Sequence, residues 1–402
     1  MTEVIERIKA KEIERGKEKR NVPELRFRGF EDEWIEKKLN EITKLTDGVH
    51  FTPEYVNNGI QFWSVETIVS NVKPKYITKE ANKLANKRCK PEKFDILMTR
   101  IGTLAKSKVL TDDNAINIYV SVALIKSNKI FNSFFLKQYF DTNIYYKDFL
   151  SKALLTAVPK KINMDSLKQT KVKLPSLQEQ KKIADFFSLV DKKIEKQSEK
   201  VEALKTYKKG IMQKIFKQEI RFKDENGREY PEWENIQLDR ICNIKKGEQI
   251  NKLNLSLTGK YYVLNGGISY SGFTDRYNTE ENTISISEGG NSCGYVNFNH
   301  NKFWSGGHCY TLLNLSSNII VRYLYNYLKF KEKQIMNLRV GSGLPNIQKN
   351  ALSALSITLP CFKEQTKIAT FLSTIDKKIE KEEKKLEKLK VYKKGLLQKM
   401  FV

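Results

Sequence analysis

The feature that most constrains the fold is a long segment that occurs twice. Residues 172–216 align with residues 357–401 without a gap, and more than half of the aligned positions are identical. A weaker match links residues 25–34 to residues 220–233 through an Arg-Phe pair and a Glu-Trp pair. The chain is therefore a tandem repeat. The long segments share Leu174-Pro175 with Leu359-Pro360, Glu179-Gln180 with Glu364-Gln365, Asp191 to Lys196 with Asp376 to Lys381, and Tyr207 to Gly210 with Tyr392 to Gly395.

Between the repeats the two halves diverge almost completely. Each divergent block, residues 38–174 and residues 236–359, has the size of a single domain, which is about 100–150 residues. Short β-rich runs broken by glycines, such as Thr283 to Ser287, alternate in them with helical patterns, such as Asn132 to Phe140. We therefore expect two α/β or α+β heads. The expected layout is an N-terminal helical extension over 1–20, a first head over 21–174, a central long helix over 175–217, a second head over 218–359 and a C-terminal long helix over 360–402.

The repeated segments are predicted to be long helices. Each follows a proline and runs about 40 residues without another, which is a rod of roughly 60 Å. Apolar residues recur at alternating steps of four and three, which is the pattern of a coiled coil. The apolar positions are Ile183, Phe187, Val190, Ile194, Val201, Leu204, Ile211 and Ile215, and Ile368, Leu372, Ile375, Ile379, Leu386, Leu389, Leu396 and Met400.

Four polar residues interrupt this stripe: Gln197, Lys208, Glu382 and Lys393. We expect the two helices to pair with each other in antiparallel orientation, with the heads at opposite ends of the rod. The predicted register places Lys208 opposite Glu382 and Gln197 opposite Lys393, so that polar residues face polar residues. Two alternatives stay open: each helix lies on its own head, or the four polar residues lie at the edge of the coil and specify no register.

The charge balance indicates a polyanionic partner. The chain has 72 Lys and Arg residues against 47 Asp and Glu residues, a formal charge of +25. A high density of basic side chains favours nucleic acid, because phosphate contacts release counterions. A lysine-rich proteome and an anionic membrane surface are the alternatives.

The cysteines and the apolar runs point to a reduced cytoplasmic protein. The five cysteines are scattered and never have Cys-x-x-Cys spacing, so neither a disulfide framework nor a zinc site is favoured. No apolar run approaches the roughly 20 residues of a membrane span. We expect no bound metal and a cytoplasmic location.

Catalytic motifs are absent from the sequence. It has neither a Gly-x-x-x-x-Gly-Lys-Ser/Thr phosphate loop nor the Asn/Asp-Pro-Pro-aromatic motif of an amino-methyltransferase. Gly341-Ser342-Gly343 is better interpreted as a turn than as a nucleotide site. The chain has three histidines, His50, His300 and His308, which are too few to favour an acid/base site built from imidazole groups. We expect a protein that is not an enzyme by itself.

The whole arrangement resembles the specificity subunit of type I restriction-modification systems, over essentially the full chain. The repeated segments carry most of the resemblance. Asp47-Gly48-Val49-His50-Phe51-Thr52-Pro53 is similar to the Asp-Gly-x-His-x-Thr-Pro turn of many target-recognition domains in that family. At the comparable place the second block has Lys246-Gly247-Glu248-Gln249, without the His and Pro, so the two heads are expected to read different sequences.

The resemblance implies a non-catalytic protein that reads a split, asymmetric site on double-stranded DNA, one part with each target-recognition domain. It also implies a scaffold for two methyltransferase subunits and, usually, two restriction-translocase subunits. S-adenosylmethionine, ATP and magnesium would then be bound by those partners and not by this chain.

Candidate DNA-reading residues are polar or basic side chains on glycine-rich loops, since these reach base edges and phosphates. Two other functions stay open: a stand-alone DNA-modifying or DNA-cleaving enzyme whose catalytic residues escape motif analysis, and a dimeric DNA-binding regulator. The regulator is disfavoured because a symmetric dimer normally reads two equal half-sites with identical domains. The candidates are His50, Thr52, Arg100, Lys106 and Lys108 in the first head, and Tyr270, Arg276, Asn291 and Ser292 in the second.

Overall fold

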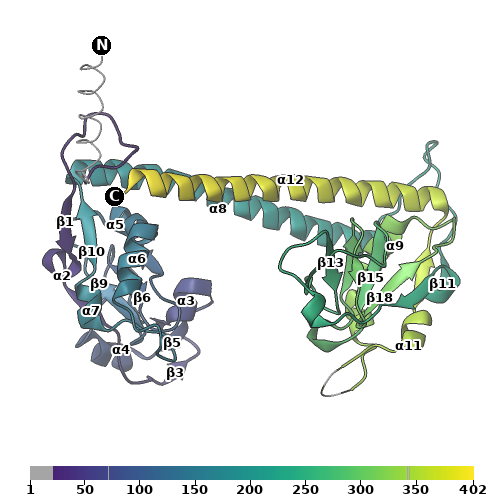
Figure 1. The fold of residues 1–402 in the computed structure, drawn as a ribbon, viewed down its shortest axis with the longest axis horizontal. Helices are drawn as coiled ribbons and strands as arrows, with labels where there is room; N and C mark the ends of the chain where they lie inside the picture. The colour runs from purple at the N-terminus through teal and green to yellow at the C-terminus, as the bar shows by residue number, and fades with distance from the viewer. Residues whose placement is uncertain (1–20, 71, 342, 344) are drawn as a thin grey trace, which may run out of the picture. The chain divides into compact units, whose positions relative to one another are not determined.

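The computed structural model describes residues 21–70, 72–341, 343 and 345–402, so the predicted extension over residues 1–20 lies outside the described residues. The described chain forms two compact units. One holds the residues up to Gln197 together with Lys385–Val402, and the other holds Ser198–Lys384. Each unit therefore contains one head and part of both long helices (Figure 1).

The first head is built on a four-stranded antiparallel sheet and a four-stranded mixed sheet packed against it. A strand pair, β1 with β10, joins the start of the head to its end. In the mixed sheet, β4 and β8 are parallel. The sheets have the orders β2-β9-β6-β7 and β3-β5-β4-β8. The strand bounds are β1 Ile35–Lys38, β2 Leu45–Asp47, β3 Tyr55–Val56, β4 Ile60–Trp63, β5 Lys75–Ile77, β6 Ile96–Thr99, β7 Ser107–Val109, β8 Ile116–Ile118, β9 Val122–Ile125 and β10 Lys171–Leu174.

Alternation along β6 explains why all four of its residues are buried. Side chains of a strand point to opposite faces in turn. Ile96 and Met98 pack in one core with Phe135 of helix α5, and Leu97 packs in another with Ile118 of the mixed sheet. The helix bounds in this head are α2 Leu39–Ile42, α3 Val65–Ser70, α4 Lys79–Asn86, α5 Ser133–Phe140, α6 Asn143–Ser151 and α7 Met164–Lys168.

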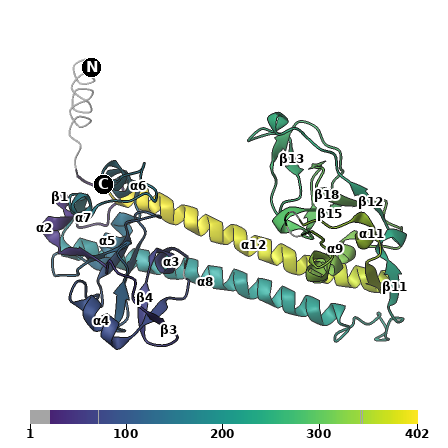
Figure 2. The same cartoon turned by 90° about the horizontal axis from the view of Figure 1, so that it is seen from below.

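The second head repeats this sheet plan with a different sequence. Its four-stranded sheet has the order β12-β18-β15-β16, its mixed sheet the order β14-β13-β17, and β11 pairs with β19. Helix α9 packs on the four-stranded sheet (Figure 2). The bounds are β11 Glu234–Gln237, β12 Asn243–Lys246, β13 Tyr261–Leu264, β14 Gly272–Thr274, β15 Thr283–Ser287, β16 Val296–Asn299, β17 Trp304–Ser305, β18 Cys309–Leu313, β19 Ser356–Leu359, α9 Val321–Phe330, α10 Glu332–Met336 and α11 Lys349–Ser353, with 3-10 turns at Leu238–Arg240, Lys252–Asn254 and Gly290–Ser292.

The fold-class prediction is confirmed: two α/β heads in tandem are each followed by a long helix, in an internal repeat. The long helices are α8, Leu177–Phe216, and α12, Phe362–Met400. The repeat includes the packing of a phenylalanine at the C-terminal end of each long helix. Phe216 packs its ring against Tyr323 and Tyr327 in the second head. Phe401, directly after α12, occupies the corresponding place in the first head, where it packs against Phe135.

The two helices are antiparallel, but the predicted register is wrong. In the second unit, Lys208 bonds to Asp376 with Nζ 2.6 Å from Oδ1, and Glu382 lies 2.8 Å from Lys200. In the first unit, Lys393 bonds to Asp191 at 2.6 Å, whereas the prediction placed it opposite Gln197. The apolar layers agree with the ion pairs, since Leu396 and Met400 cluster with Ile183 and Phe187. The helices are offset by about one heptad from the prediction.

The error has a physical reason. The prediction required each polar residue to face another polar residue in the same layer of the seam. A lysine has a long flexible stem, so it can cover apolar surface while its ammonium group reaches a carboxylate beside the seam. Lys208 and Lys393 both do this and keep most of their side chains buried.

Candidate nucleic-acid interface

The turn after β2 requires glycine because two strands approach it closely. The Gly48 N–H donates to the Val122 carbonyl at 3.2 Å, and the Val49 N–H donates to the Ile118 carbonyl at 3.0 Å. A Cβ atom at position 48 would lie 2.1 Å from the Ile118 oxygen. Any larger residue would push the turn away from β8.

The second head has the same turn after β12. The Gly247 N–H donates to the Cys309 carbonyl and the Glu248 N–H to the Ser305 carbonyl, both at 2.8 Å. A Cβ atom at position 247 would lie 2.4 Å from the Ser305 oxygen. Lys246 therefore occupies the position in the second head that Asp47 occupies in the first.

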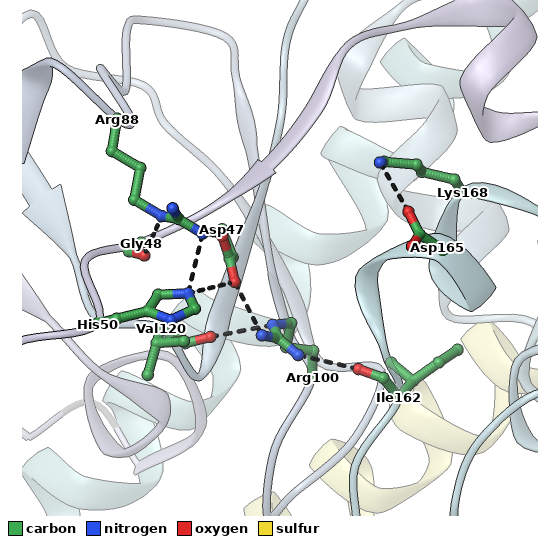
Figure 3. A network of polar contacts seen from close by, with 9 residues as sticks. All are labelled: Asp47, Gly48, His50, Arg88, Arg100, Val120, Ile162, Asp165 and Lys168. Carbon is green, nitrogen blue, oxygen red and sulfur yellow. Dashed lines mark hydrogen bonds and ion pairs between the residues drawn. The ribbon is translucent and has the colours of Figure 1, made fainter.

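Asp47 is the centre of a polar network in the first head (Figure 3). Its carboxylate is buried and accepts from Arg100 Nη2 at 2.8 Å and from Arg88 Nη2 at 2.5 Å, while His50 Nε2 lies 2.9 Å from Oδ2. Burial alone would raise the pKa of Asp47, but the hydrogen bonds from His50, Arg88 and Arg100 outweigh burial and hold that pKa below its usual value. Asp47 thus stays ionised and fixes the groups around it.

Arg100 cannot make the DNA contact predicted for it. Its side chain is only 9% exposed, and its guanidinium group donates to the Val120 and Ile162 carbonyls, each at 3.0 Å, as well as to Asp47. Figure 3 shows the Arg100 guanidinium group in contact with these three partners. Its position after a β-rich run and before a glycine indicated a loop, whereas the side chain turns inward to the buried Asp47. The prediction for Arg100 is wrong.

The second head has a matching ion pair with the charges exchanged. Lys246 Nζ lies 2.5 Å from Oε1 of Glu288, whose side chain is 10% exposed. The Tyr310 hydroxyl donates to the same oxygen at 3.2 Å. Glu288 follows β15 as Arg100 follows β6, and the backbone bonds of the two residues correspond. These bonds are Arg100 N to Ser121 O and Ile162 N to Arg100 O in the first head, and Glu288 N to His308 O and Ile347 N to Glu288 O in the second.

Each head has a surface hollow near its glycine turn, with polar and apolar residues in its lining. The first hollow has a volume of about 470 Å³ and the second about 550 Å³. They correspond in part, because Ser64 and Asn265, which both follow the strand that pairs in parallel with its neighbour, line one hollow each. Lys246 and Glu288 line the second hollow, whereas Asp47 and Arg100 line a separate hollow of about 480 Å³ together with Arg88. The first hollow is lined by Thr52, Tyr55, Phe62, Ser64, Val65, Glu66, Thr67, Val72, Lys73, Lys75, Tyr119 and Ser121. The second is lined by Lys246, Asn265, Gly266, Gly267, Ser271, Glu288, Gly289, Gly290, Asn291, Ser292, His308, Pro345 and Asn346.

The remaining candidates of the first head lie at different places on it. His50 is exposed beside Asp47, and Thr52 lines the first hollow. Lys106 and Lys108 are exposed but do not line that hollow. Lys108 holds its ammonium group 4.7 Å from the ring centroid of Trp63. Of these four candidates, His50 and Thr52 lie at the turn and the hollow, and Lys106 and Lys108 lie outside both.

In the second head, Asn291 and Ser292 both line the second hollow. Tyr270 is exposed and packs against Phe273, with ring centroids 5.0 Å apart. Arg276 lines a separate hollow of about 600 Å³ near Trp304. DNA contact by these side chains stays a prediction.

Two side chains that sequence reasoning did not select also belong to these surfaces. Arg88 is half exposed beside His50 and Asp47, and His308 lines the second hollow with its Nδ1 3.5 Å from Glu288 Oε2. No motif marks Arg88, because it lies in a divergent block and reaches Asp47 only through the fold. His308 could have been found by its rarity, as one of three histidines in the chain.

Nothing in the described ranges provides a metal centre. No group of three or more His, Cys, Asp or Glu side chains among those residues is placed to hold a metal ion, and the five cysteines are free thiols. In the same part of the chain, no helix is both long and apolar enough to cross a bilayer.

The chain thus has two heads of one fold, each with a glycine turn and a differently lined surface hollow, and each followed by a long helix. The family model described as type I restriction modification DNA specificity domain matches residues 31–205 and residues 230–391. These two matches cover most of the chain, one for each head and its following helix. The chain belongs to this family of type I restriction-modification specificity subunits.

Individual relatives agree with the assignment. A protein named as a putative type I specificity subunit in Mycoplasma genitalium is 37% identical over 150 residues, which is 37% of this chain and 39% of the relative. One from Mycoplasma pneumoniae is 39% identical over 150 residues, 37% of this chain and 40% of the relative. The aligned stretch thus spans about two fifths of each curated relative.

Solved structures share this fold over most of the chain. The crystal structure of a type I restriction-modification S subunit from M. genitalium has a TM-score of 0.63 at 19% identity and covers 95% of this chain and 99% of that chain. A chain from a study of complex assembly and conformational transition of the type I system has a TM-score of 0.56 at 15% identity, covering 92% of this chain and 98% of its own.

Proposed function

We propose that this specificity subunit reads a bipartite, asymmetric site on double-stranded DNA, with one part read by each head. The observation that carries the proposal is that two heads of one fold differ in the residues that line their surface hollows. The fold repeats down to its backbone hydrogen bonds, while the ion pair beside the glycine turn exchanges its charges. This combination supports two readers with separate specificities on one plan.

The chemistry of the hollows suits base edges and phosphates. Exposed Lys73 and aromatic Tyr55 line the first, and Asn265, Asn291 and His308 line the second. Amide, hydroxyl and basic groups are those that form hydrogen bonds with DNA, and glycine-rich turns allow the backbone to approach closely. A formal charge of +25 supports contact with a polyanion.

We further propose that the chain has no catalytic activity itself and scaffolds two methyltransferase subunits and, usually, two restriction-translocase subunits. S-adenosylmethionine, ATP and magnesium would be bound by those partners. The repeat supports an even number of partners, because two nearly identical helical segments offer two nearly identical surfaces. The fold likeness to a chain studied for assembly of a type I system agrees with such a complex.

Assays of the purified chain test whether catalysis belongs to this chain or to its partner subunits. Incubated alone with DNA and S-adenosylmethionine, or with magnesium and ATP, it should give no methyl transfer and no cleavage, and adding methyltransferase subunits should produce methylation at a defined site. Turnover by the chain alone would favour a stand-alone enzyme.

Footprinting tests how the site is divided. The chain in complex with its methyltransferase partners should protect two short parts of a duplex separated by a few unprotected base pairs, on the order of one helical turn between their centres. Protection of a single continuous part, or of two identical inverted parts, would contradict two different readers and would favour a symmetric regulator.

A further inference from the structure

Arg88 is held in place by the turn that carries the family motif. It follows α4 and is 49% exposed at the side chain. Its Nε donates to the Gly48 carbonyl at 3.1 Å, and its Nη2 lies 2.5 Å from Asp47 Oδ1 (Figure 3). Two protein acceptors therefore fix one edge of the guanidinium plane. An arginine fixed in this way loses little rotamer freedom when it binds a ligand.

The opposite edge of the same guanidinium group remains available. Arginine has five N–H donors in a planar fork, and the contacts to Gly48 and Asp47 use one from Nε and one from Nη2. Among the described residues, none accepts a hydrogen bond from Nη1. The end of the guanidinium group, with Nη1 and Nη2, therefore faces a ligand that approaches the exposed side of the head.

His50 decides whether the Nη2 half of that fork is free. Its Nε2 lies 2.9 Å from both Asp47 Oδ2 and Arg88 Nη2. A carboxylate only accepts hydrogen bonds, so Nε2 carries a proton when His50 bonds to Asp47. A protonated Nε2 cannot accept from Arg88, so the second Nη2 hydrogen becomes available to a ligand that moves the His50 ring out of its 2.9 Å contact. Asp47 therefore positions both side chains at once.

Among the four bases, guanine matches this fork best. Its major-groove edge presents two acceptors, O6 and N7, and arginine contacts them with two parallel hydrogen bonds. We propose that Arg88 is a specificity-determining residue that reads a guanine in the first part of the DNA site, positioned by Asp47 and Gly48. The inference rests on the proposed function and adds a base and a residue to it.

The second head offers no counterpart to Arg88. In the first head, α4 lies along the chain between β5 and β6 and leads into Arg88, whereas residues 265–282 between β13 and β15 contain no helix. Guanine recognition by an arginine held in this way is therefore expected in one part of the site only. This difference is a further reason for the site to be asymmetric.

The test uses the chain assembled with its methyltransferase subunits and maps methylated sites by sequencing. Arg88→Ala should relax the preference for one guanine in the first part of the site by about 5- to 150-fold, the range expected for a bidentate base contact. The second part should not change. Arg88→Lys keeps the charge without the fork and should relax the same position. Arg28→Ala removes another exposed arginine, one that precedes β1, and should leave both parts unchanged.

A modified base makes the test independent of folding. Replacing the guanine by 7-deazaguanine removes the N7 acceptor, so it should weaken binding by the wild-type complex and have no further effect on the Arg88→Ala complex. Uniformly weaker binding to every sequence by Arg88→Ala, with a smaller salt dependence, would identify a phosphate contact and overturn the inference. So would an unchanged site. A wild-type complex without any sequence preference would instead refute the proposed function.

Discussion

At the scale of single residues, Gly48 and Gly247 show how little side-chain volume the turns tolerate. Each meets backbone oxygens of a neighbouring strand at distances that no Cβ atom could accept. Other glycines of the chain are different. Gly210 lies inside α8, and nothing lies within 4 Å of the place where a Cβ atom would be, so an alanine fits there. The two kinds of glycine provide a matched pair of substitutions.

Gly48→Ala should lower the melting temperature of the first unit and abolish binding to the first part of the site, because the turn must move away from Ile118. The expected loss of stability is roughly 1–3 kcal/mol, in the range of backbone strain. Gly210→Ala should leave binding unchanged and raise stability by about 0.5–1 kcal/mol, since alanine favours helix. Calorimetry and binding to duplexes with one part of the site measure both. A Gly48→Ala protein with normal first-part binding would show that the turn does not position the reader.

The lowered pKa of Asp47 predicts a specific pH dependence of the stability of the first unit. Its pKa is lower in the folded protein than in the unfolded chain, so its interactions stabilise the fold above the unfolded pKa of about 3.9 and lose that effect as pH falls toward the folded value. Asp47→Asn removes the titrating group. The difference in melting temperature between wild type and Asp47→Asn should be widest above about pH 4 and should shrink at lower pH. A difference that stays constant from about pH 7 to about pH 3 would show that ionised Asp47 is not what stabilises the network.

The residue scale also shows where sequence reasoning stops. Thr52, Asn291 and Ser292 were selected as polar side chains on loops, and each lines a hollow. Arg100 met the same criterion but is buried against Asp47. Arg88 was not selected, because its importance comes from two contacts to residues about 40 positions away. Chemistry and loop position are visible in a sequence, but the direction of a side chain in a divergent block is not.

At the scale of elements, local patterns predicted more than long-range ones. The helix expected from Asn132 to Phe140 is α5, and Asn132 caps it by accepting from the N–H groups of Phe134 and Phe135. The β-rich run from Thr283 to Ser287 is β15. The heptad positions of α8 and α12 were also visible. Their register was not, because it depends on which carboxylate a flexible lysine reaches on another helix.

The observed register can be tested by exchanging charges. Lys208→Glu should destabilise the second unit slightly, and adding Asp376→Lys should restore most of the loss. Adding Glu382→Lys to Lys208→Glu should not restore it. The coupling energy should be about 0–1 kcal/mol, since Asp376 is 38% exposed and solvent screens the pair. Coupling between positions 208 and 382 that exceeds coupling between 208 and 376 would restore the original prediction.

The phenylalanines at the helix ends give a second element-scale prediction. Phe401 packs with ring centroids 5.8 Å from Trp34 and 5.5 Å from Phe135, and Phe216 packs 5.7 Å from Tyr323. Each substitution to alanine should cost roughly 3–5 kcal/mol, as for other buried aromatic rings. Phe401→Ala should lower only the unfolding transition of the first unit, and Phe216→Ala only that of the second. Calorimetry that shows one shared transition, shifted equally by both variants, would contradict two separately closed cores.

At the scale of the whole molecule, the repeat is more complete in structure than in sequence. The heads share the order of the four-stranded antiparallel sheet, the glycine turn and the place of an ion pair, although residues 38–174 and residues 236–359 have little sequence in common. The long helices are similar enough to be found twice in the sequence. The sheets are not, because a buried strand accepts many apolar sequences of the same pattern.

This plan predicts that the heads are exchangeable readers. Replacing residues 38–174 by the corresponding block of a related specificity subunit brings in the donor's own strand in place of β10. That strand can pair with the rest of β1 through backbone bonds, and α8 and Phe401 stay in place to pack on the donor's core, so the first unit should still fold. Sequencing of methylated DNA from the complex of the exchanged chain with its methyltransferase subunits then tests the central claim directly. One part of the recognised site should change to that of the donor, and the other part should remain as it was. If the exchange changed both parts, or neither, the account of two independent DNA-reading heads would be contradicted.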